Sequence, residues 1–392
     1  MALSRKRENE IVPQYSLTGD LLSFLRCSLQ YRYHNGSALP PSRPVQLWFG
    51  EFIHGVMEGA FRLWSTSQPQ PPFPWPCTPT TPRQDPPPGR LPHDIGTIGD
   101  VVEGTLRAQG KNPRSYDTRD NAYVRATRAV NELGPHLFPL IAAAEEKVIG
   151  TRAIPQGGSQ GPGARSTLYE LHGIIDVVTD VQLSGAATNN VIRQAIQNAC
   201  PGLTGQYEVI VDYKGSRRPG TNEPYWAQGE WQVQTYAWLR TRQPQSLPVV
   251  AGVLLYVNEL APVSSDLVSL RREWANGNTD VVPANGTPDA YALSTWRPSN
   301  AIPNFSLEFR LARAIRVIPI DATSQANATM QFDNVVANIE QCVSTEAVAG
   351  AINPHWTPCG DEETCAACDF RHFCRDPHPH NGQHVVEAPA AP

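Results

Sequence analysis

Residues 207–215 read YEVIVDYKG, and this stretch decides the fold. Its tyrosine, valine and isoleucine residues favour a β-strand, and the glycine ends the run. Side chains two apart in a strand share a face, so Asp212 and Lys214 are expected side by side while Tyr213 points away. A carboxylate can hold a divalent cation, and a neighbouring ammonium group can orient a water molecule. The alternative without a functional role is that Asp212 and Lys214 form a surface ion pair on an edge strand.

Segments on both sides of this strand supply further candidate residues. Upstream, residues 173–176 read GIID and place Asp176 at the end of an apolar run, where a buried charge needs a partner such as a metal ion. Downstream, Gln232 and Tyr236 are four apart and share a face of an expected helix. His54 lies on the apolar face of another expected helix. Each residue taken singly has an alternative without a functional role. Asp176 would face solvent, Gln232 and Tyr236 would lie on an ordinary helix surface, and His54 would be a core residue.

Periodicity organises the rest of the chain as a mixed α/β core surrounded by helices and loops. Expected helices cover residues 20–34, 46–64, 114–144, 192–199, 229–242, 266–274 and 322–348. Expected strands cover residues 147–154, 166–180, 207–215, 248–257 and 311–320. The first two strands are joined by a glycine-rich loop, which predicts a long hairpin.

These patterns divide the chain into six regions. They are an N-terminal helical region (1–66), a proline-rich insertion or linker (67–93), the α/β core (94–260), an additional strand and helix region (261–350), a cysteine-rich segment (351–376) and a tail expected to be disordered (377–392). The insertion is too rich in proline to pack a core and favours an extended or disordered chain.

Composition places the protein among intracellular proteins. The formal net charge is −5 over 392 residues, so nonspecific coating of nucleic acid by a basic arm is excluded. No apolar run is long enough to span a bilayer, and the N-terminus lacks the apolar core of a signal peptide. Eight cysteines without such a signal favour a reducing compartment and metal or cluster ligands over disulfides. A cytoplasmic location without membrane contact is expected.

Four of the cysteines gather near the C-terminus. Cys365, Cys368 and Cys374 follow the spacing C-x2-C-x5-C, and a tetrahedral site or an iron–sulfur cubane needs a fourth ligand. Cys359 is the local candidate and Cys27 the distant one. Spacing alone leaves open both the fourth ligand and the choice between zinc and a cluster.

The motifs in order resemble those of RecB-type nucleases in the PD-(D/E)XK superfamily: G-x3-H, G-x-x-D, D-x-K and Q-x3-Y. The resemblance implies a restriction-endonuclease-like mixed sheet flanked by helices. It implies metal ligation by His54, Asp176 and Asp212, with Mg²⁺ or Mn²⁺ as the ion. Asp176, Asp212 and Lys214 would be catalytic. The sequence departs from the family where Val177 replaces a frequent arginine and Val211 replaces the proline of the superfamily name.

The same resemblance assigns the remaining residues. Gln232 and Tyr236 would contact substrate. AddB-type helicase–nuclease subunits and CRISPR-associated adaptation nucleases carry one early cysteine and three in C-x2-C-x5-C form, which together bind a 4Fe–4S cluster. Cys27, Cys365, Cys368 and Cys374 match that arrangement, although Ser28 replaces the proline often found after the first cysteine. The implied cluster joins the N-terminal helix to the C-terminal tail, with zinc as the less favoured alternative.

The resulting hypothesis is a metal-dependent DNA nuclease, an exonuclease on single strands or DNA ends. Its implied setting is DNA repair, recombination or defence. The chain has no P-loop motif, so any unwinding requires a partner, for which a helicase or a defence-complex protein is the candidate. Arg217 and Arg218 are candidates for phosphate contacts. The alternatives are a catalytically idle DNA-binding or structural subunit of such a complex, and a zinc-binding structural protein in which D-x-K is coincidental.

Overall fold

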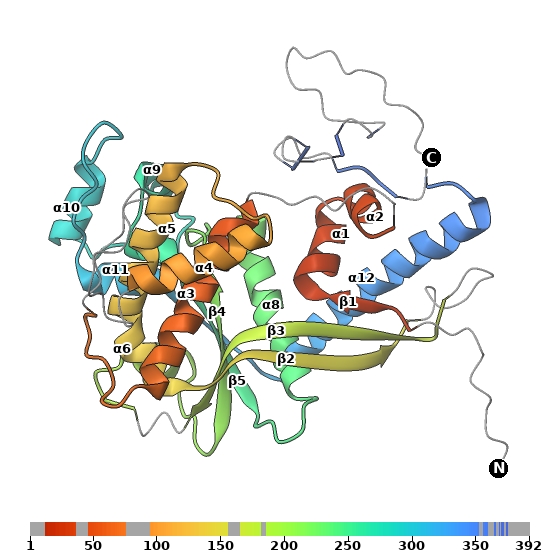
Figure 1. The fold of residues 1–392 in the computed structure, drawn as a ribbon, viewed down its shortest axis with the longest axis horizontal. Helices are drawn as coiled ribbons and strands as arrows, with labels where there is room; N and C mark the ends of the chain where they lie inside the picture. The colour runs from red at the N-terminus through yellow and green to blue at the C-terminus, as the bar shows by residue number, and fades with distance from the viewer. Residues whose placement is uncertain are drawn as a thin grey trace.

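A six-stranded mixed sheet forms the centre of the molecule, with helices on both of its faces (Figure 1). The computed structural model describes residues 12–36, 46–75, 95–155, 165–181, 186–352, 356–359, 364, 365, 368, 370, 371 and 374. The arrangement confirms the predicted mixed α/β class and agrees with the predicted sheet flanked by helices.

The strands follow the order β1–β3–β4–β5–β6, and β2 pairs with the other edge of β3. Their bounds are Gln14–Ser16 (β1), Ile141–Ala153 (β2), Leu168–Val181 (β3), Tyr207–Lys214 (β4), Val249–Tyr256 (β5) and Ile315–Pro319 (β6). The β2–β3 pair is the expected long antiparallel hairpin, while β4 and β5 run parallel. Because β4 lies between β3 and β5, residues 207–215 do not form an edge strand, and the alternative of an edge ion pair fails.

One face of the sheet is covered by a group of helices, of which α3 (Gln46–Thr66) is the longest. The other helices on this side are α4 (Ile95–Ala108), α5 (Tyr116–Arg128), the short α6 (Gly134–Leu137) and α7 (Val191–Ala199). The buried face of α3 packs with Val209 and Val211 of β4 in one hydrophobic core. Side chains at odd positions of β4 thus point toward α3, which places Tyr213 on that side as well.

The opposite face is covered by α8 (Pro224–Arg240) and α12 (Ala322–Ala349). Ile210 of β4 packs here, as do Trp231 and Trp238 of α8 and Phe332 of α12. Asp321 begins α12 with a capping box, and Gly350 ends it in the left-handed conformation at φ 66°. Trp231 and Trp238 therefore belong to the core on this side of the sheet.

The N-terminal helix differs from its prediction, because it is broken at Cys27. A π-helical turn (Leu17–Leu21) leads into α1 (Leu22–Arg26), and α2 (Ser28–Gly36) follows. Cys27 between them is extended at φ −160°, and its sulfur accepts a hydrogen bond from the backbone N–H of Gln30. The thiol thus takes the place of a side-chain cap at the start of α2, which explains why the helix restarts there.

Three further segments correct the sequence-based assignments. Residues 141–144, expected to end a helix in an alanine run, instead begin β2 because they pair with β3. Residues 311–314, expected as strand, belong to α11 (Leu307–Ala314), which Ser306 caps. The segment 261–310, expected to be irregular apart from a helix at 266–274, contains that helix as α9 (Ser264–Asn276) and a second helix, α10 (Pro288–Thr295), that was not predicted. These helices share a small core of their own with Trp296, Phe305 and Phe309.

Several predictions fall outside the described residues. Most of the proline-rich insertion, the tip of the β2–β3 hairpin and the tail at 377–392 are among them. Within the described part of the chain, no helix combines the length and the apolar character needed to cross a membrane. The division into six regions remains a prediction.

Candidate active site

Strand β4 places Asp212 and Lys214 on one side of the sheet, as predicted. Lys214 Nζ lies 2.6 Å from Asp212 Oδ2, and Asp212 is 3% exposed. The strand holds both residues in place because its apolar side chains are buried on both faces of the sheet. A nearly buried carboxylate is thus paired with a lysine that still reaches solvent.

Asp176 enters the same site at the point where β3 and β4 separate. The antiparallel pairing of these strands ends at Val177 and Val211, one residue before Asp176 and Asp212. There the Asp176 Oδ2 atom accepts a hydrogen bond of 2.8 Å from the backbone N–H of Tyr213. A side chain therefore replaces the next bond of the ladder, and the carboxylate sits in the opening between the two strands.

His54 approaches from α3 and contacts both strands. Its Nε2 atom lies 2.9 Å from the carbonyl oxygen of Tyr213, which can only accept, so Nε2 carries the proton. Its Nδ1 atom lies 3.2 Å from Asp176 Oδ1. In the neutral ring this nitrogen has a lone pair that would face the lone pairs of the carboxylate. The geometry therefore requires a cation between them, either a proton on the ring or a metal ion.

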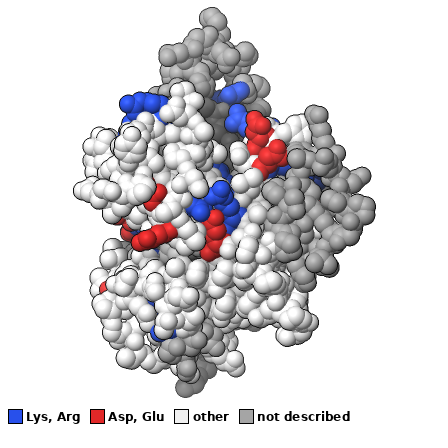
Figure 2. All heavy atoms as spheres, turned by 90° about the vertical axis from the view of Figure 1, so that its left-hand side faces the viewer, with Lys and Arg blue, Asp and Glu red and all other residues white. Residues whose placement is uncertain are grey.

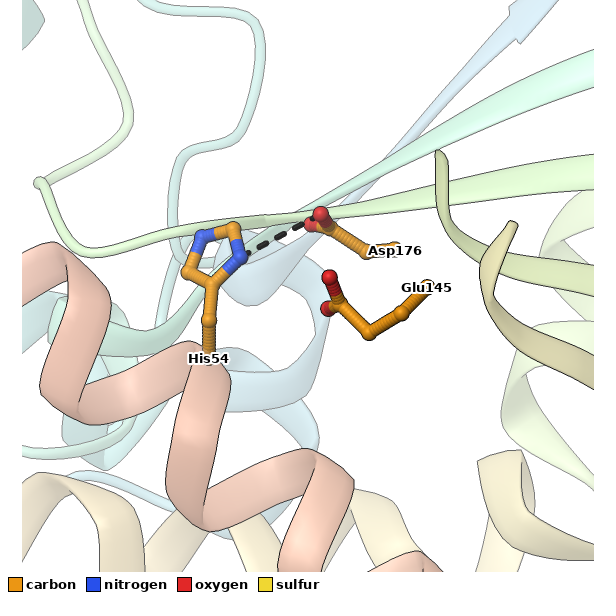
Figure 3. Close-up of side chains that lie close together, drawn as sticks. All are labelled: His54, Glu145 and Asp176. Carbon is orange, nitrogen blue, oxygen red and sulfur yellow. Dashed lines mark ion pairs between the residues drawn. The ribbon is translucent and has the colours of Figure 1, made fainter. Parts of the chain in front are cut away.

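Glu145 completes this group from strand β2. In the register, Ala144 pairs with Val177 and Glu146 with Ile175, which leaves Glu145 beside Asp176 without a ladder partner. Its backbone is left-handed at φ 54°, an uncommon conformation for glutamate. Figure 3 shows its carboxylate directed toward His54 and Asp176, and one ligand atom from each residue lies within 4.8 Å of the others. Among the described residues, this is the group of His, Cys, Asp or Glu side chains close enough to hold one metal ion, and Asp212 is not part of it.

Sequence reasoning missed Glu145. It is the first of two glutamates after an alanine run, and nothing in that pattern separates it from solvent-exposed strand surface. The information lies in the pairing of β2 with β3, which is a long-range contact. Glu145 can be recognised as a candidate only when the register of β2 against β3 is known, because that register places it beside Asp176.

The electrostatics of the group reflect crowded carboxylates. Burial alone would lower the pKa of His54, but the Asp176 carboxylate outweighs it and raises the pKa to about 9. Burial and the charges of Asp176 and Glu58 raise the pKa of Glu145 to about 7. Burial also raises the pKa of Asp212, although Lys214 acts in the opposite direction. Burial is the largest cause of the shifts of Glu145 and Asp212, and the charge of Asp176 adds to both.

Gln232 of α8 links the two residues of the D-x-K motif. Its Oε1 atom accepts a hydrogen bond from Lys214 Nζ, and its Nε2 atom donates to Asp212 Oδ1 at 2.9 Å. The Tyr236 hydroxyl lies 3.5 Å from the same Nε2. Gln232 and Tyr236 are 7% and 5% exposed. The structure thus brings the motif residues on β4 and α8 together, but with both α8 side chains turned inward.

The arginines expected near phosphate are engaged elsewhere. Arg217 pairs with Glu223 and Glu273, and Arg218, 3% exposed, pairs with Asp280 and donates to backbone carbonyls. On the face shown in Figure 2, basic and acidic side chains lie next to one another and most of the described surface carries neither. These two arginines therefore bind the α9–α11 region to the end of β4 and are not free for a phosphate.

The cysteines of the first and last segments meet in one pocket. Cys27, Cys359, Cys365, Cys368 and Cys374 all line it. Burial, followed by the neighbouring thiols of Cys27, Cys374 and Cys365, raises the pKa of Cys368 to about 11. Cys359 Sγ lies 3.6 Å from Cys365 Sγ. The pocket thus brings Cys27, distant in sequence, together with the C-terminal cysteines.

Hydrogen bonds from Ser28 and Leu29 to Thr357 hold the two sides of this pocket together. The Ser28 hydroxyl donates to the carbonyl of Thr357 at 2.9 Å and accepts from its N–H at 2.7 Å. The N–H of Leu29 donates to the same carbonyl at 3.2 Å. Ser28 and Leu29 therefore attach α2 directly to the segment that precedes Cys359.

The comparison with known families covers the second half of this site. Residues 204–375 match the PD-(D/E)XK nuclease superfamily. The matched range includes Asp212, Lys214, Gln232 and Tyr236, whereas His54 and Asp176 precede it. A search of curated proteins finds no match. Over this range, which is less than half of the chain, the protein is similar to a superfamily of nucleases.

Proposed function

We propose that this protein is a Mg²⁺- or Mn²⁺-dependent deoxyribonuclease whose catalytic residues are Asp176, Asp212 and Lys214, with His54, Asp176 and Asp212 as metal ligands. The observation that carries the proposal is the meeting of these side chains where β3 and β4 separate, next to a segment that matches a nuclease superfamily. An isolated D-x-K pair would have no reason to attract a histidine from α3 and an aspartate from β3.

The donor atoms fit a hard divalent cation. Carboxylate oxygens are the preferred ligands of Mg²⁺ and Mn²⁺, and imidazole is an accepted additional ligand. The Nε2–H of His54 donates to the carbonyl of Tyr213, the kind of contact that orients metal-binding histidines and leaves the other nitrogen free for the ion. When bound, such an ion would polarise the scissile phosphate and promote ionisation of a nucleophilic water.

The chain's own residues would position the reactants. Lys214 has three N–H donors, and its contacts with Asp212 and Gln232 leave one for the attacking water or for a phosphate oxygen. The water oxygen forms a bond to phosphorus while the bond to the leaving oxygen breaks, and the ammonium offsets the added negative charge. Substrate contact by Gln232 and Tyr236 remains a prediction. Their burial supports a second role, in which Gln232 holds Lys214 and Asp212 in position.

The finer assignments rest on the resemblance to AddB-type and CRISPR-associated nucleases. We propose exonuclease action on single-stranded DNA or DNA ends, a helicase or defence-complex partner, and a cytoplasmic location. We also propose a 4Fe–4S cluster on Cys27, Cys365, Cys368 and Cys374, with zinc as the less favoured alternative. The shared pocket supports this set of four, because Cys368 has the other three as electrostatic neighbours.

A catalytically idle DNA-binding subunit is the competing function. The intact set of Asp176, Asp212 and Lys214 argues against it, because burying two carboxylates without a catalytic role costs stability.

The test is a nuclease assay on single- and double-stranded DNA, labelled at either end, with protein purified without oxygen. Wild type is expected to cleave with Mg²⁺ or Mn²⁺ and to lose cleavage in EDTA. Lys214→Ala is expected to lose at least about 100-fold in rate. Lys147→Ala, which changes an exposed lysine of β2, is the matched control and should cleave like wild type. Folded, metal-binding wild type that cleaves none of these substrates would favour the idle subunit.

A further inference from the structure

Glu145 is an acidic side chain in this site that the proposed set of metal ligands leaves out. It forms no hydrogen bond and no ion pair with any residue that the structure describes, although it is only partly exposed. Its nearest charged neighbours include the carboxylates of Asp176 and Glu58. A partly buried carboxylate close to two others is electrostatically unfavourable, and His54 and Arg62 offset this only in part, because the pKa of Glu145 stays raised.

The backbone at this position also departs from ordinary strand geometry. Glu145 is one of two described residues other than glycine with positive φ, and its neighbours Ala144 and Glu146 keep the regular β2–β3 register. The local irregularity turns one side chain toward Asp176 without shifting the strand on either side. Such irregularities in strands often redirect a side chain at a functional site.

The atoms that Glu145 faces are themselves short of positive charge. Asp176 is 7% exposed, its Oδ2 atom is used by Tyr213, and its Oδ1 atom faces His54 Nδ1 at 3.2 Å. In the neutral, metal-binding form of His54, with the ring proton on Nε2, both Oδ1 and Nδ1 present lone pairs to the space that Glu145 borders. Figure 3 shows the three side chains converging from α3, β2 and β3.

We propose that Glu145 is a protein ligand of the divalent cation, so that His54, Glu145 and Asp176 hold the ion together. Asp212 is not one of these three; Lys214 and Gln232 orient it, and it remains the further ligand named in the proposed function. The inference rests on the proposed metal-dependent nuclease and adds a ligand that the D-x-K motif and the superfamily match leave out. It also explains why the carboxylate is unpaired among the described side chains: its partner is the ion.

The chain offers a matched control next to Glu145. Glu146 lies one residue further along β2, carries the same charge and pairs with Arg240 at 3.3 Å, outside the group. Arg240 keeps its closer partner, Glu208, at 2.7 Å when Glu146 is changed. Glu145→Gln and Glu146→Gln therefore make the same chemical change on the same strand, once inside the metal group and once outside.

The experiment measures Mn²⁺ binding to the full chain by isothermal titration calorimetry, after chelation with EDTA and without DNA. Wild type and Glu146→Gln are expected to bind alike. Glu145→Gln is expected to bind at least about tenfold more weakly, and Asp176→Asn to lose binding. Electron spin-echo spectroscopy of bound Mn²⁺ should show coupling to a ¹⁴N nucleus from His54 in wild type and in Glu145→Gln at saturating Mn²⁺.

A thermal measurement separates a ligand from a structural residue. Without metal, Glu145→Gln is expected to unfold at the same or a higher Tm than wild type, because the change removes repulsion among carboxylates. Its increase in Tm on adding Mn²⁺ should be smaller than that of wild type. A structural role would lower the metal-free Tm and leave the Mn²⁺-dependent increase unchanged.

The outcomes distinguish the two proposals. Equal Mn²⁺ affinity in wild type and Glu145→Gln, with binding lost in Asp176→Asn, would overturn the role of Glu145 and leave the nuclease intact. Folded wild type that binds no Mn²⁺ and cleaves no DNA would overturn both.

Discussion

The ring of Tyr236 lies directly against the backbone of Gly173. A Cβ atom built on Gly173 would be 2.7 Å from Tyr236 Cε1, closer than real side chains approach one another. Gly173 of G-x-x-D and Tyr236 of Q-x3-Y thus pack against each other. This contact holds α8 against β3 three residues before Asp176. Two sequence motifs that looked independent are coupled through this contact.

Gly173→Ala is therefore expected to destabilise the protein by about 1–3 kcal/mol, because the methyl group overpacks the contact with Tyr236. Nuclease activity should fall more than stability alone explains, since Asp176 shifts with β3. Chemical denaturation and cleavage rates measure the two effects. Gly104→Ala is the control, because nothing lies within 4 Å of a Cβ at that helical position, and it should stabilise by about 0.5–1 kcal/mol. Equal behaviour of the two variants would show that the contact is loose.

Gln232→Ala tests whether the amide positions Lys214 and Asp212. The cleavage rate is expected to fall about 10- to 100-fold, while Mn²⁺ affinity stays within a few-fold of wild type. Loss of the buried hydrogen bonds should cost about 1–3 kcal/mol of stability. Gln234→Ala, two residues along the same helix, is the control and should be near neutral. If Gln232→Ala changed only KM for DNA, the side chain would be a substrate contact instead.

The pH dependence of stability follows from His54 and Glu145. Both have pKa values above their usual range in the folded protein, about 9 and about 7. A raised folded pKa adds stability that is fully present below the unfolded pKa and is lost as pH rises through the folded value. Metal-free protein should therefore lose stability from about pH 4.5 to 9, the span between the usual value for glutamate and the raised value for His54.

Affinity for Mn²⁺ should rise over the same span, because binding displaces protons from the ligands. Thermal unfolding in EDTA and calorimetry with Mn²⁺, each at a series of pH values, measure the two trends. Glu145→Gln should lack the loss of stability between about pH 4.5 and 7. A profile identical to that of wild type would contradict the environment assigned to Glu145.

The cysteine pocket gives a prediction about which thiol is the fourth ligand. In protein purified without oxygen, Cys27→Ser is expected to lose iron and acid-labile sulfide, and Cys359→Ser to retain them. The reason is that Cys27 is buried beside Cys368 and its sulfur accepts a backbone hydrogen bond. Iron retained in Cys27→Ser but lost in Cys359→Ser would reverse the assignment. Zinc in place of iron in the wild-type protein would contradict the proposal of an iron–sulfur cluster.

The sequence was most informative where structure is local. Residues 207–215 predicted an apolar strand with Asp212 and Lys214 on one face, because alternation and the final glycine encode both. Glu145 could not be found, because its role depends on pairing between β2 and β3. The same limit explains the alanine run at 142–144, where pairing overrides helix propensity.

Cys27 shows the converse. The helical pattern of residues 20–34 is real on both sides of it, but a single capping thiol divides the pattern into α1 and α2. Of the helices in the α9–α11 region only α9 was predicted, because the small core of this region draws on apolar residues scattered between Leu267 and Phe309.

The hydrogen bond from the Tyr213 N–H to Asp176 has a practical consequence. One oxygen of this carboxylate accepts the hydrogen bond that a strand carbonyl would otherwise accept. Replacing Asp176 with alanine would therefore separate the end of the β3–β4 pair as well as remove a proposed ligand. Such a variant would confound inactivity with local unfolding. The Lys214 side chain is 22% exposed and forms no hydrogen bond with the backbone among the described residues. An inactive protein for trapping uncleaved DNA is therefore better made at Lys214 than at Asp176.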